Sequence, residues 1–548
     1  LPISFVNNVI PVSRFDPVAL KIQSLIPQAN FGGSTALFNN YLPAYNADRK
    51  TDLTSIKMDQ NMGSKGKISG FYSLTRTRSA TSQVLGADGL PDPISQARGN
   101  FDWVHTVRIN YDYNLSPSML LHIGVGYVNQ RGPTSYVPGR NDFDVASLGL
   151  TGVPYTGVFP RITGLTGANN TGGMSTMGQS TAGTGFKSWR PSGNISLTWI
   201  KDNHTFKFGG ESIIGHYTDG SLSTNRGIFN YSANSTADAA LFGQAIAGGV
   251  SVGFPYASFL LGATDSYQIG PTTNQHMREK SFAFFAQDTW KVTRRLTLDY
   301  GLRYDFQTYL REGAGRMPSF SPTAINPVYG RPGATIYDGF LPGRCQCNLG
   351  KNYPFGFGPR LGVAYQVNTK TVLRGGFAVV YNKTAANNNL TVLGNDAAYA
   401  SPGNYIPALN LKDGVNVAIT PWPNLSPSLF PTTQGSTPGG LGVIDPGVGR
   451  PARQAQWSIG VQREIARNIV LETSYVGNRG AWWQAPGLTT YNAISNDALK
   501  AAGLDINSAA DQALLRGGVR AAGAVTRGFR SEEHTSELQS LAYLVCRL

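Results

Sequence analysis

A strict two-residue alternation governs much of this sequence. In LTLDYGLRYDF (residues 296–306) every second residue is apolar, from Leu296 to Phe306, and the residues between them are polar or glycine. Because a strand directs successive side chains to opposite faces, this segment would have one apolar and one polar face. Its length also fits the roughly 9–11 residues of a strand that crosses a bilayer.

The same alternation recurs along the chain, in residues 107–114, 121–127, 195–199, 206–208, 373–382 and 457–462. Many of these segments form pairs with short polar turns, near residues 202–203, 293–295, 368–369 and 466–468. Long stretches rich in Gly, Pro, Asn and Thr separate the pairs, at about 132–189, 310–355 and 384–452. Short turns at one end and long loops at the other are typical of outer-membrane barrels.

The polar faces of these strands carry several charges each. Arg108 and Asp112 share one face, and Asp299, Arg303 and Asp305 share another. Charges at this density are costly in a dry core but not in a water-filled lumen. A propeller would show a repeat of roughly 40–50 residues, and the sequence shows none. The pattern therefore predicts an all-β fold, an antiparallel transmembrane barrel with long loops.

Composition and motifs argue against several classes of function. Charged residues make up 14% of the chain, against roughly 25% in ordinary soluble domains. The net charge is +14, but the basic residues are scattered singly, which argues against a nucleic-acid partner. The sequence has no His-Glu-x-x-His, phosphate-loop or Gly-x-Ser-x-Gly motif. We therefore expect no enzyme activity, no catalytic residue, and no bound cofactor or metal.

Two cysteines stand close together in a loop, Cys345 and Cys347 in GRCQCN. Their spacing lacks the second ligand pair of a zinc site. A local disulfide in an oxidising compartment and two idle thiols both fit this pattern. No ligand-binding residue is identified by the sequence.

Three segments carry a family resemblance: FFAQDTWKVTRRLTLDYGLRYDF, GPRLGVAYQVNTKTVLRGGFAVVYNK and QWSIGVQREIARNIVLETSYVGNRG. In combination and order they resemble the barrel of TonB-dependent outer-membrane transporters, in the Oar-like group. NVIPVSRFDPVALKIQSLIPQAN (8–30) resembles the segment that joins plug and barrel in these proteins. It predicts a short helix with Asp16 as its N-cap and Pro17 at its first position.

The resemblance implies a location in the outer membrane of a Gram-negative bacterium. It implies energised uptake of an unidentified small-molecule or oligomeric ligand, with the TonB complex as partner through an N-terminal region. Outer-membrane lipid and lipopolysaccharide are the expected surroundings. A passive porin-like or adhesion barrel is the alternative, and a secreted β-rich enzyme or carbohydrate-binding module is a third.

The resemblance also implies a division of the chain. Family members carry a signal peptide, a carboxypeptidase-regulatory-like domain, a TonB-contact segment and a plug, none of which is recognised here. About 14 strands are expected from the pattern, against 22 in such transporters. We therefore expect a fragment: a plug-to-barrel connecting segment with a short helix (1–50) and a partial barrel (51–529). Residues 530–540, RSEEHTSELQS, resemble a translated sequencing adapter, so 530–548 are interpreted as an artefact.

Overall fold

The structure is a computed structural model of the 548-residue chain. It describes residues 9–33, 39–43, 49–82, 90–95, 98–132, 143–167, 173–179, 183–221, 224–237, 253–382, 397–402, 406–419, 421–428, 443–483, 497, 500, 503–505 and 507–516. Residues 530–548 lie outside this set, so their interpretation as an adapter stays a prediction.

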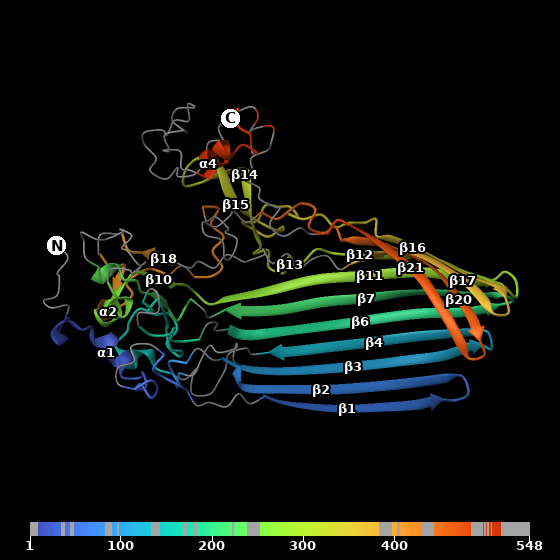
Figure 1. Cartoon of the computed structure of the whole chain (residues 1–548), viewed down its shortest axis with the longest axis horizontal. Coiled ribbons are helices and arrows are strands. Elements are labelled where there is room, and N and C mark those ends of the chain that lie inside the picture. Colours follow the sequence, from blue (N-terminus) through green and yellow to red (C-terminus); the bar gives the residue numbers. More distant parts are fainter. Residues whose placement is uncertain are drawn as a thin grey trace. The chain divides into compact units, whose positions relative to one another are not determined.

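One large antiparallel sheet dominates the described residues, and its long strands lie side by side in chain order (Figure 1). The path runs through β1 (Arg49–Met62), β2 (Gly66–Ser82), β3 (Arg98–Ser116), β4 (Met119–Gly132), β6 (Gly183–Lys201), β7 (His204–Ser221), β11 (Thr273–Lys291), β12 (Leu296–Gln307), β16 (Phe357–Asn368), β17 (Thr371–Tyr381), β20 (Arg453–Ala466) and β21 (Ile469–Ala481). With β13 (Arg311–Glu312), which pairs with β11, the sheet has 13 strands.

The connections between long strands alternate in length. The short turns are residues 63–65, 117–118, 202–203, 292–295, 369–370 and 467–468. The long connections are 83–97, 133–182, 222–272, 308–356 and 382–452. Since neighbouring strands are antiparallel, all the short turns lie at one end of the sheet and all the long connections at the other. We call these the short-turn end and the long-connection end.

Strand pairing gives the sheet one apolar and one polar face. Between β11 and β12, Phe284 pairs with Tyr304 and Ala286 with Leu302, while Gln287 pairs with Gly301 and Phe285 with Arg303. This register continues without a shift from Ser281↔Gln307 to Lys291↔Thr297. The alternation read from the sequence therefore corresponds to two real faces of the sheet.

The apolar face is exposed rather than packed in a core. Large apolar side chains on it are open to the surroundings in most strands: Ile109, Val125, Ile195, Phe284, Leu302, Leu361, Ile459 and Tyr475. Exposed apolar surface on this scale requires an apolar environment, which the hydrocarbon layer of a membrane supplies. β1 and β21 stand at opposite ends of the strand order, with no pairing between them among the described residues. The predicted fold class, an all-β antiparallel barrel sheet that is not closed, is confirmed.

The long connections carry a hydrophobic core of their own. Its secondary structure comprises α1 (Pro17–Gln23), α2 (Pro255–Leu260), the short strands β5 (Arg161–Thr163), β8 (Ile228–Asn230), β9 (Ala263–Thr264), β10 (Ser266–Ile269), β18 (Ala397–Ala400) and β19 (Leu409–Asn410), and the 3-10 turns η2 (Val12–Arg14), η3 (Val145–Leu148), η5 (Asn234–Thr236) and η6 (Leu411–Asp413). Ile22, Ile94, Phe159, Phe259 and Leu411 are among its buried side chains. Segments from four different connections and the N-terminal region thus share one core.

Asp16 joins three of these segments. Its carboxylate caps α1 by accepting from the amides of Val18 (2.8 Å) and Ala19 (3.2 Å), and it accepts from the amide of Lys412 (2.9 Å). Its own amide donates to the carbonyl of Leu260 at 2.8 Å. Gly262 (φ +68°) lies so close that a Cβ there would be 2.2 Å from Asp16 Oδ2. The N-terminal helix is therefore fixed to the connections at the long-connection end.

The connection from β12 to β16 is folded as well. Besides β13 it contains the hairpin of β14 (Pro318–Asn326) and β15 (Arg331–Tyr337). Met277, Tyr309, Leu310, Met317 and Ile444 form its small buried cluster. The sequence predicted only a long polar loop at 310–355, because its short strands have no sustained alternation.

The chain divides into two compact units, residues 1–431 with 444–483, and residues 432–443 with 484–548. The sheet and both cores belong to the first unit. In the second, the described helix is α4 (Ala509–Arg516). Among the described residues, no helix is both long and apolar enough to cross a membrane. The predicted division at residues 50 and 529 stays a prediction.

Replacing Asp16 by alanine should loosen the N-terminal helix without unfolding the sheet. The variant loses an N-cap, which costs about 1 kcal/mol, and leaves the Lys412 amide without its acceptor. We expect faster tryptic cleavage at Lys21 and Lys412 and an unchanged urea midpoint for the sheet. Asp16→Asn keeps an acceptor oxygen and should cleave at an intermediate rate. Equal cleavage rates in all three proteins would contradict this role.

Candidate functional site: the polar face and its loops

The polar face of the sheet is organised around an arginine. Arg303 on β12 donates through Nη1 and Nη2 to both carboxylate oxygens of Glu211 on β7, at 3.3 and 3.1 Å. Its Nε donates to Asp305 at 2.9 Å. A bidentate guanidinium–carboxylate pair has a defined geometry, so these three side chains hold one another in place.

Three hollows open on this face around the Arg303 cluster. One of about 190 Å³ is lined by Lys207, Glu211, Gln287, Arg303 and Arg360. A second of about 370 Å³ shares Lys207 and Glu211 and adds Asp112 and His122. A third of about 460 Å³ follows β12, β16, β17 and β20 and includes Asp299, Arg360 and Gln456. Together they form a wet surface with both signs of charge.

Asp112 and His122 contribute a second polar pair to this face. His122 Nδ1 lies 2.7 Å from Asp112 Oδ1, and the two residues are direct partners on β3 and β4. The alternation in residues 121–127 puts His122 among the polar positions but gives it no partner. The partner follows from strand register, which one sequence does not show.

The apolar face holds one buried carboxylate that the alternation did not reveal. Asp288 shares the side of β11 that carries Phe284 and Trp290, and it is buried. Its Oδ2 lies 2.7 Å from His204 Nδ1 and accepts from the Tyr300 hydroxyl at 2.8 Å. His204 in turn stacks on Trp290, with ring centroids 5.2 Å apart. Both contacts go to one oxygen of this carboxylate, which lies near the short-turn end, where aromatic rings mark the membrane interface.

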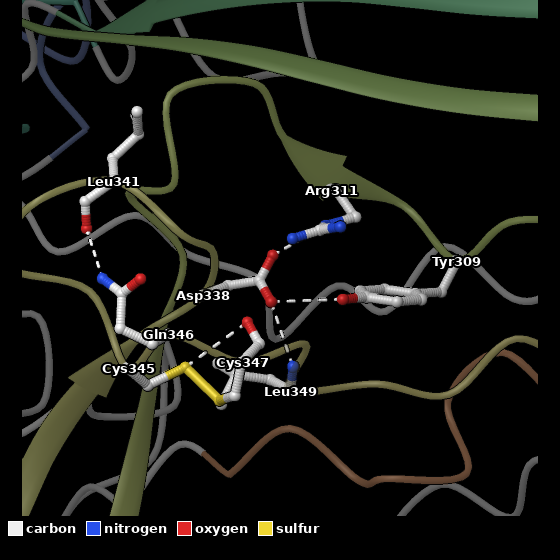
Figure 2. The surroundings of a disulfide bond; sticks show 8 residues. All are labelled: Tyr309, Arg311, Asp338, Leu341, Cys345, Gln346, Cys347 and Leu349. Atoms are coloured by element: carbon white, nitrogen blue, oxygen red, sulfur yellow. Dashed lines mark hydrogen bonds and ion pairs between the residues drawn. A yellow bond between two sulfur atoms is a disulfide. The ribbon is translucent and has the colours of Figure 1, made fainter.

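The two cysteines predicted to lie in a loop are joined in this structure (Figure 2). The sulfur atoms of Cys345 and Cys347 are 2.12 Å apart. The Cys347 amide and carbonyl both bond to Gly339, at 3.3 and 2.9 Å, and the Cys345 amide donates to Tyr337 at 2.9 Å. The disulfide thus closes a turn that already lies against the end of β15.

A buried carboxylate lies beside the disulfide (Figure 2). Asp338 is fully buried and accepts from Arg311 Nε at 2.8 Å, from the Tyr309 hydroxyl at 3.1 Å and from the Leu349 amide at 3.0 Å. Burial, and next the charge of Asp338, raise the pKa of Tyr309 to about 12. Tyr309 therefore stays a hydrogen-bond donor at any physiological pH.

Glu312 is the second buried carboxylate of this connection. It accepts from the amides of His276 (3.1 Å), Ala314 (2.8 Å) and Arg316 (3.1 Å), and it forms an ion pair with the Arg316 guanidinium. That guanidinium also stacks over Trp422, 4.3 Å from the ring centroid. Burial by itself raises the pKa of Glu312, but the bonds from Arg316 and the backbone amides outweigh it and hold the pKa below its usual value.

Within the described part of the chain, no group of three His, Cys, Asp or Glu side chains is placed to hold a metal ion. The polar face instead offers hydrogen-bonding and charged groups along hollows, and the loops offer a rigid, partly apolar surface. A polar face of this kind, opposite an exposed apolar face, is typical of the lumen side of an outer-membrane barrel. These features define the class of the protein, an outer-membrane β-barrel.

The chain belongs to the family of the outer membrane beta barrel domain, which matches residues 2–529. A comparison with curated protein sequences gave no significant match.

Several solved outer-membrane proteins are similar to this chain at low sequence identity. The ferric yersiniabactin uptake receptor FyuA from Yersinia pestis is 9% identical, with 79% of this chain and 45% of that chain covered and a TM-score of 0.36. The siderophore receptor PirA from Acinetobacter baumannii is 10% identical, with 80% and 44% covered and a TM-score of 0.37. The outer membrane transporter YddB from Escherichia coli is 11% identical, with 78% and 46% covered and a TM-score of 0.35. The chain spans about half the length of these structures.

Glu312→Gln should make the β12–β16 connection less stable at neutral pH and less sensitive to acid. The pKa of Glu312 in the folded state lies below the ordinary value of 4.5. Its contribution to the stability of this connection is therefore complete above pH 4.5 and is lost as the pH falls through the folded-state pKa. The substitution should cost about 1–3 kcal/mol of local stability. Hydrogen exchange of the Ala314 and Arg316 amides from neutral to acidic pH measures both effects.

Glu472→Gln is the matched control, since Glu472 is exposed on β21. It should leave the exchange of both amides unchanged. Equal acid sensitivity in wild type and Glu312→Gln would show that another group controls this connection.

Proposed function

We propose that this chain is the barrel part of a TonB-dependent transporter of the Oar-like group, which takes up an unidentified ligand across the outer membrane. One observation supports this above others. The three family-like segments coincide with three successive hairpins of the sheet, β11–β12, β16–β17 and β20–β21, in the same order. A likeness spread over adjacent hairpins of one sheet is more specific than the same motifs scattered over unrelated elements.

The polar face supports the transport part of the proposal. Its hollows are lined by Lys207, Glu211, Arg303 and Arg360, which offer bonds to a polar solute or to another protein segment. The small-molecule or oligomeric ligand would pass along this face, the TonB complex would act through an N-terminal region, and lipid and lipopolysaccharide would surround the barrel. No enzyme activity and no nucleic-acid partner are proposed.

The division of the chain remains part of the proposal. Residues 1–50 would be a connecting segment, 51–529 barrel, and 530–548 an adapter-derived artefact. The last point is supported by the family match, which ends at residue 529. Re-sequencing the genomic locus tests it: the gene should diverge from RSEEHTSELQS at about residue 530. A genomic sequence that encodes these residues within a longer gene would refute it.

Conductance distinguishes energised transport from a passive porin-like or adhesion barrel. The product of the complete gene would be inserted into planar lipid bilayers in potassium chloride. We expect no steady current, because a plugged lumen does not conduct ions. A stable ohmic current would show that the barrel is a passive porin and would overturn the proposal.

Binding to a purified periplasmic domain of TonB is the second measurement. The complete gene product should be retained, and a variant without the TonB-contact segment should not. Equal retention of both, or of neither, would count against energy coupling.

A further inference from the structure

The apolar face changes character near the long-connection end, where it carries a band of basic side chains. We define the basic belt as the exposed side chains Arg76, Arg78, Arg131, Lys187, Arg278, Lys280, Arg453 and Arg479. They come from six strands (β2, β4, β6, β11, β20 and β21), all in the half of each strand nearer the long connections (Figure 1).

Strand register places the belt on the apolar face. Arg76 pairs with Trp103, which pairs with Arg131, which pairs with Lys187. Lys280 pairs with Ile214, two residues from Phe282 on the same face. Across β20 and β21, Arg453 pairs with Ala481 and Arg479 with Ala455, on the side that carries Trp457 and Ile459. The belt therefore lies on the surface that faces lipid.

Among the described residues, no carboxylate forms an ion pair with a side chain of the basic belt. None of its eight side chains has a carboxylate within 4.0 Å among the described residues. In the same half of this face, Asp52 lies across from Arg76, but it is ion-paired with Lys50 at 3.8 Å. The polar face differs, because Glu211, Arg303 and Asp305 balance one another there. Because positive charge gathers on this part of the apolar face without acidic side chains to balance it, we expect the face to bind an anionic partner.

Aromatic rings indicate the depth of the basic belt in the membrane. The Arg76 guanidinium lies over the Trp103 ring, 5.8 Å from its centroid, and Trp189 stacks on His216 at 3.7 Å. Tryptophan rings of this kind occupy the boundary between hydrocarbon and headgroups. The belt residues next to them, Arg131 and Lys187, extend from this boundary and bring their charges to headgroup level. At the short-turn end, the apolar face carries two basic side chains, Lys201 and Arg463, together with the ion pair of Asp288 and His204.

We propose that the basic belt binds the phosphate groups of a phosphorylated glycolipid in the outer leaflet. Long connections of outer-membrane barrels face the cell exterior, so the belt lies in the leaflet where such lipid resides. Guanidinium groups donate in a planar fork that matches phosphate oxygens, and six of the eight belt residues are arginine. This inference gives residues to the lipopolysaccharide contact in the proposed function. It rests on membrane insertion and not on energy coupling.

Vesicle binding tests the belt directly. The full 548-residue chain would be reconstituted with phosphatidylcholine vesicles that contain diphosphorylated lipid A, or the same lipid A after removal of its phosphates. We expect the lipid A phosphates to strengthen binding of the wild-type chain, measured by co-flotation at low salt. A belt variant, Arg278→Gln with Lys280→Gln, Arg453→Gln and Arg479→Gln, should lose that preference. Each removed charge weakens binding to an anionic surface about fivefold.

A charge-matched variant on the other face provides the control. Arg108, Arg190, Lys291 and Arg374 occupy polar-face positions of β3, β6, β11 and β17, and replacing all four by glutamine removes the same net charge. Circular dichroism would show that both variants keep their strands. The control should retain the wild-type preference. Equal losses in both variants, or no dependence of wild-type binding on the phosphates, would overturn the proposal whatever the result with TonB.

Discussion

The structure depends on the register of an antiparallel ladder. In a hydrocarbon layer every backbone amide and carbonyl must find a partner in the protein, and here each long strand between β1 and β21 finds it in its two neighbours. The same ladder fixes which side chains face lipid. A slip of one residue between β11 and β12 would move Arg303 to the apolar face and Leu302 to the polar face. The unbroken pairing from Ser281 to Lys291 shows how strictly that register is kept.

The long connections obey a different rule, since water can reach them and only short ladders run through them. They are held by apolar clusters of their own and by buried carboxylates that accept backbone amides. Asp16 joins α1 to the segment at Lys412, Asp338 joins the end of β15 to Leu349, and Glu312 joins β13 to His276. Each carboxylate takes up amides that would otherwise be buried without partners. The connections are therefore shaped by a few polar centres rather than by a repeating pattern.

Charge is distributed differently on the two faces of the sheet. On the polar face, opposite charges lie beside each other, as in the Glu211–Arg303–Asp305 cluster, so water and ions meet a nearly balanced surface. On the apolar face, charge is confined to the strand ends. The paired Asp288 lies at the short-turn end with Lys201 and Arg463, and basic groups such as Arg453 and Arg479 lie at the other end. This arrangement keeps the middle of the lipid-facing surface apolar, where a charge costs most.

The sequence by itself determined the class of fold. Alternation in segments such as 296–306, with short turns and long polar stretches, predicts strands with one lipid-facing side, because side-chain direction in a strand depends only on position. It also marked the cysteines at 345 and 347 and the capped helix at Asp16. Only the tertiary structure decided which residues meet: Asp288 with His204 and Tyr300, Arg303 with Glu211, and Asp16 with Lys412. Those partners are set by strand register and by loops that return from distant parts of the chain. Neither strand register nor the return of these loops can be predicted from a local sequence pattern.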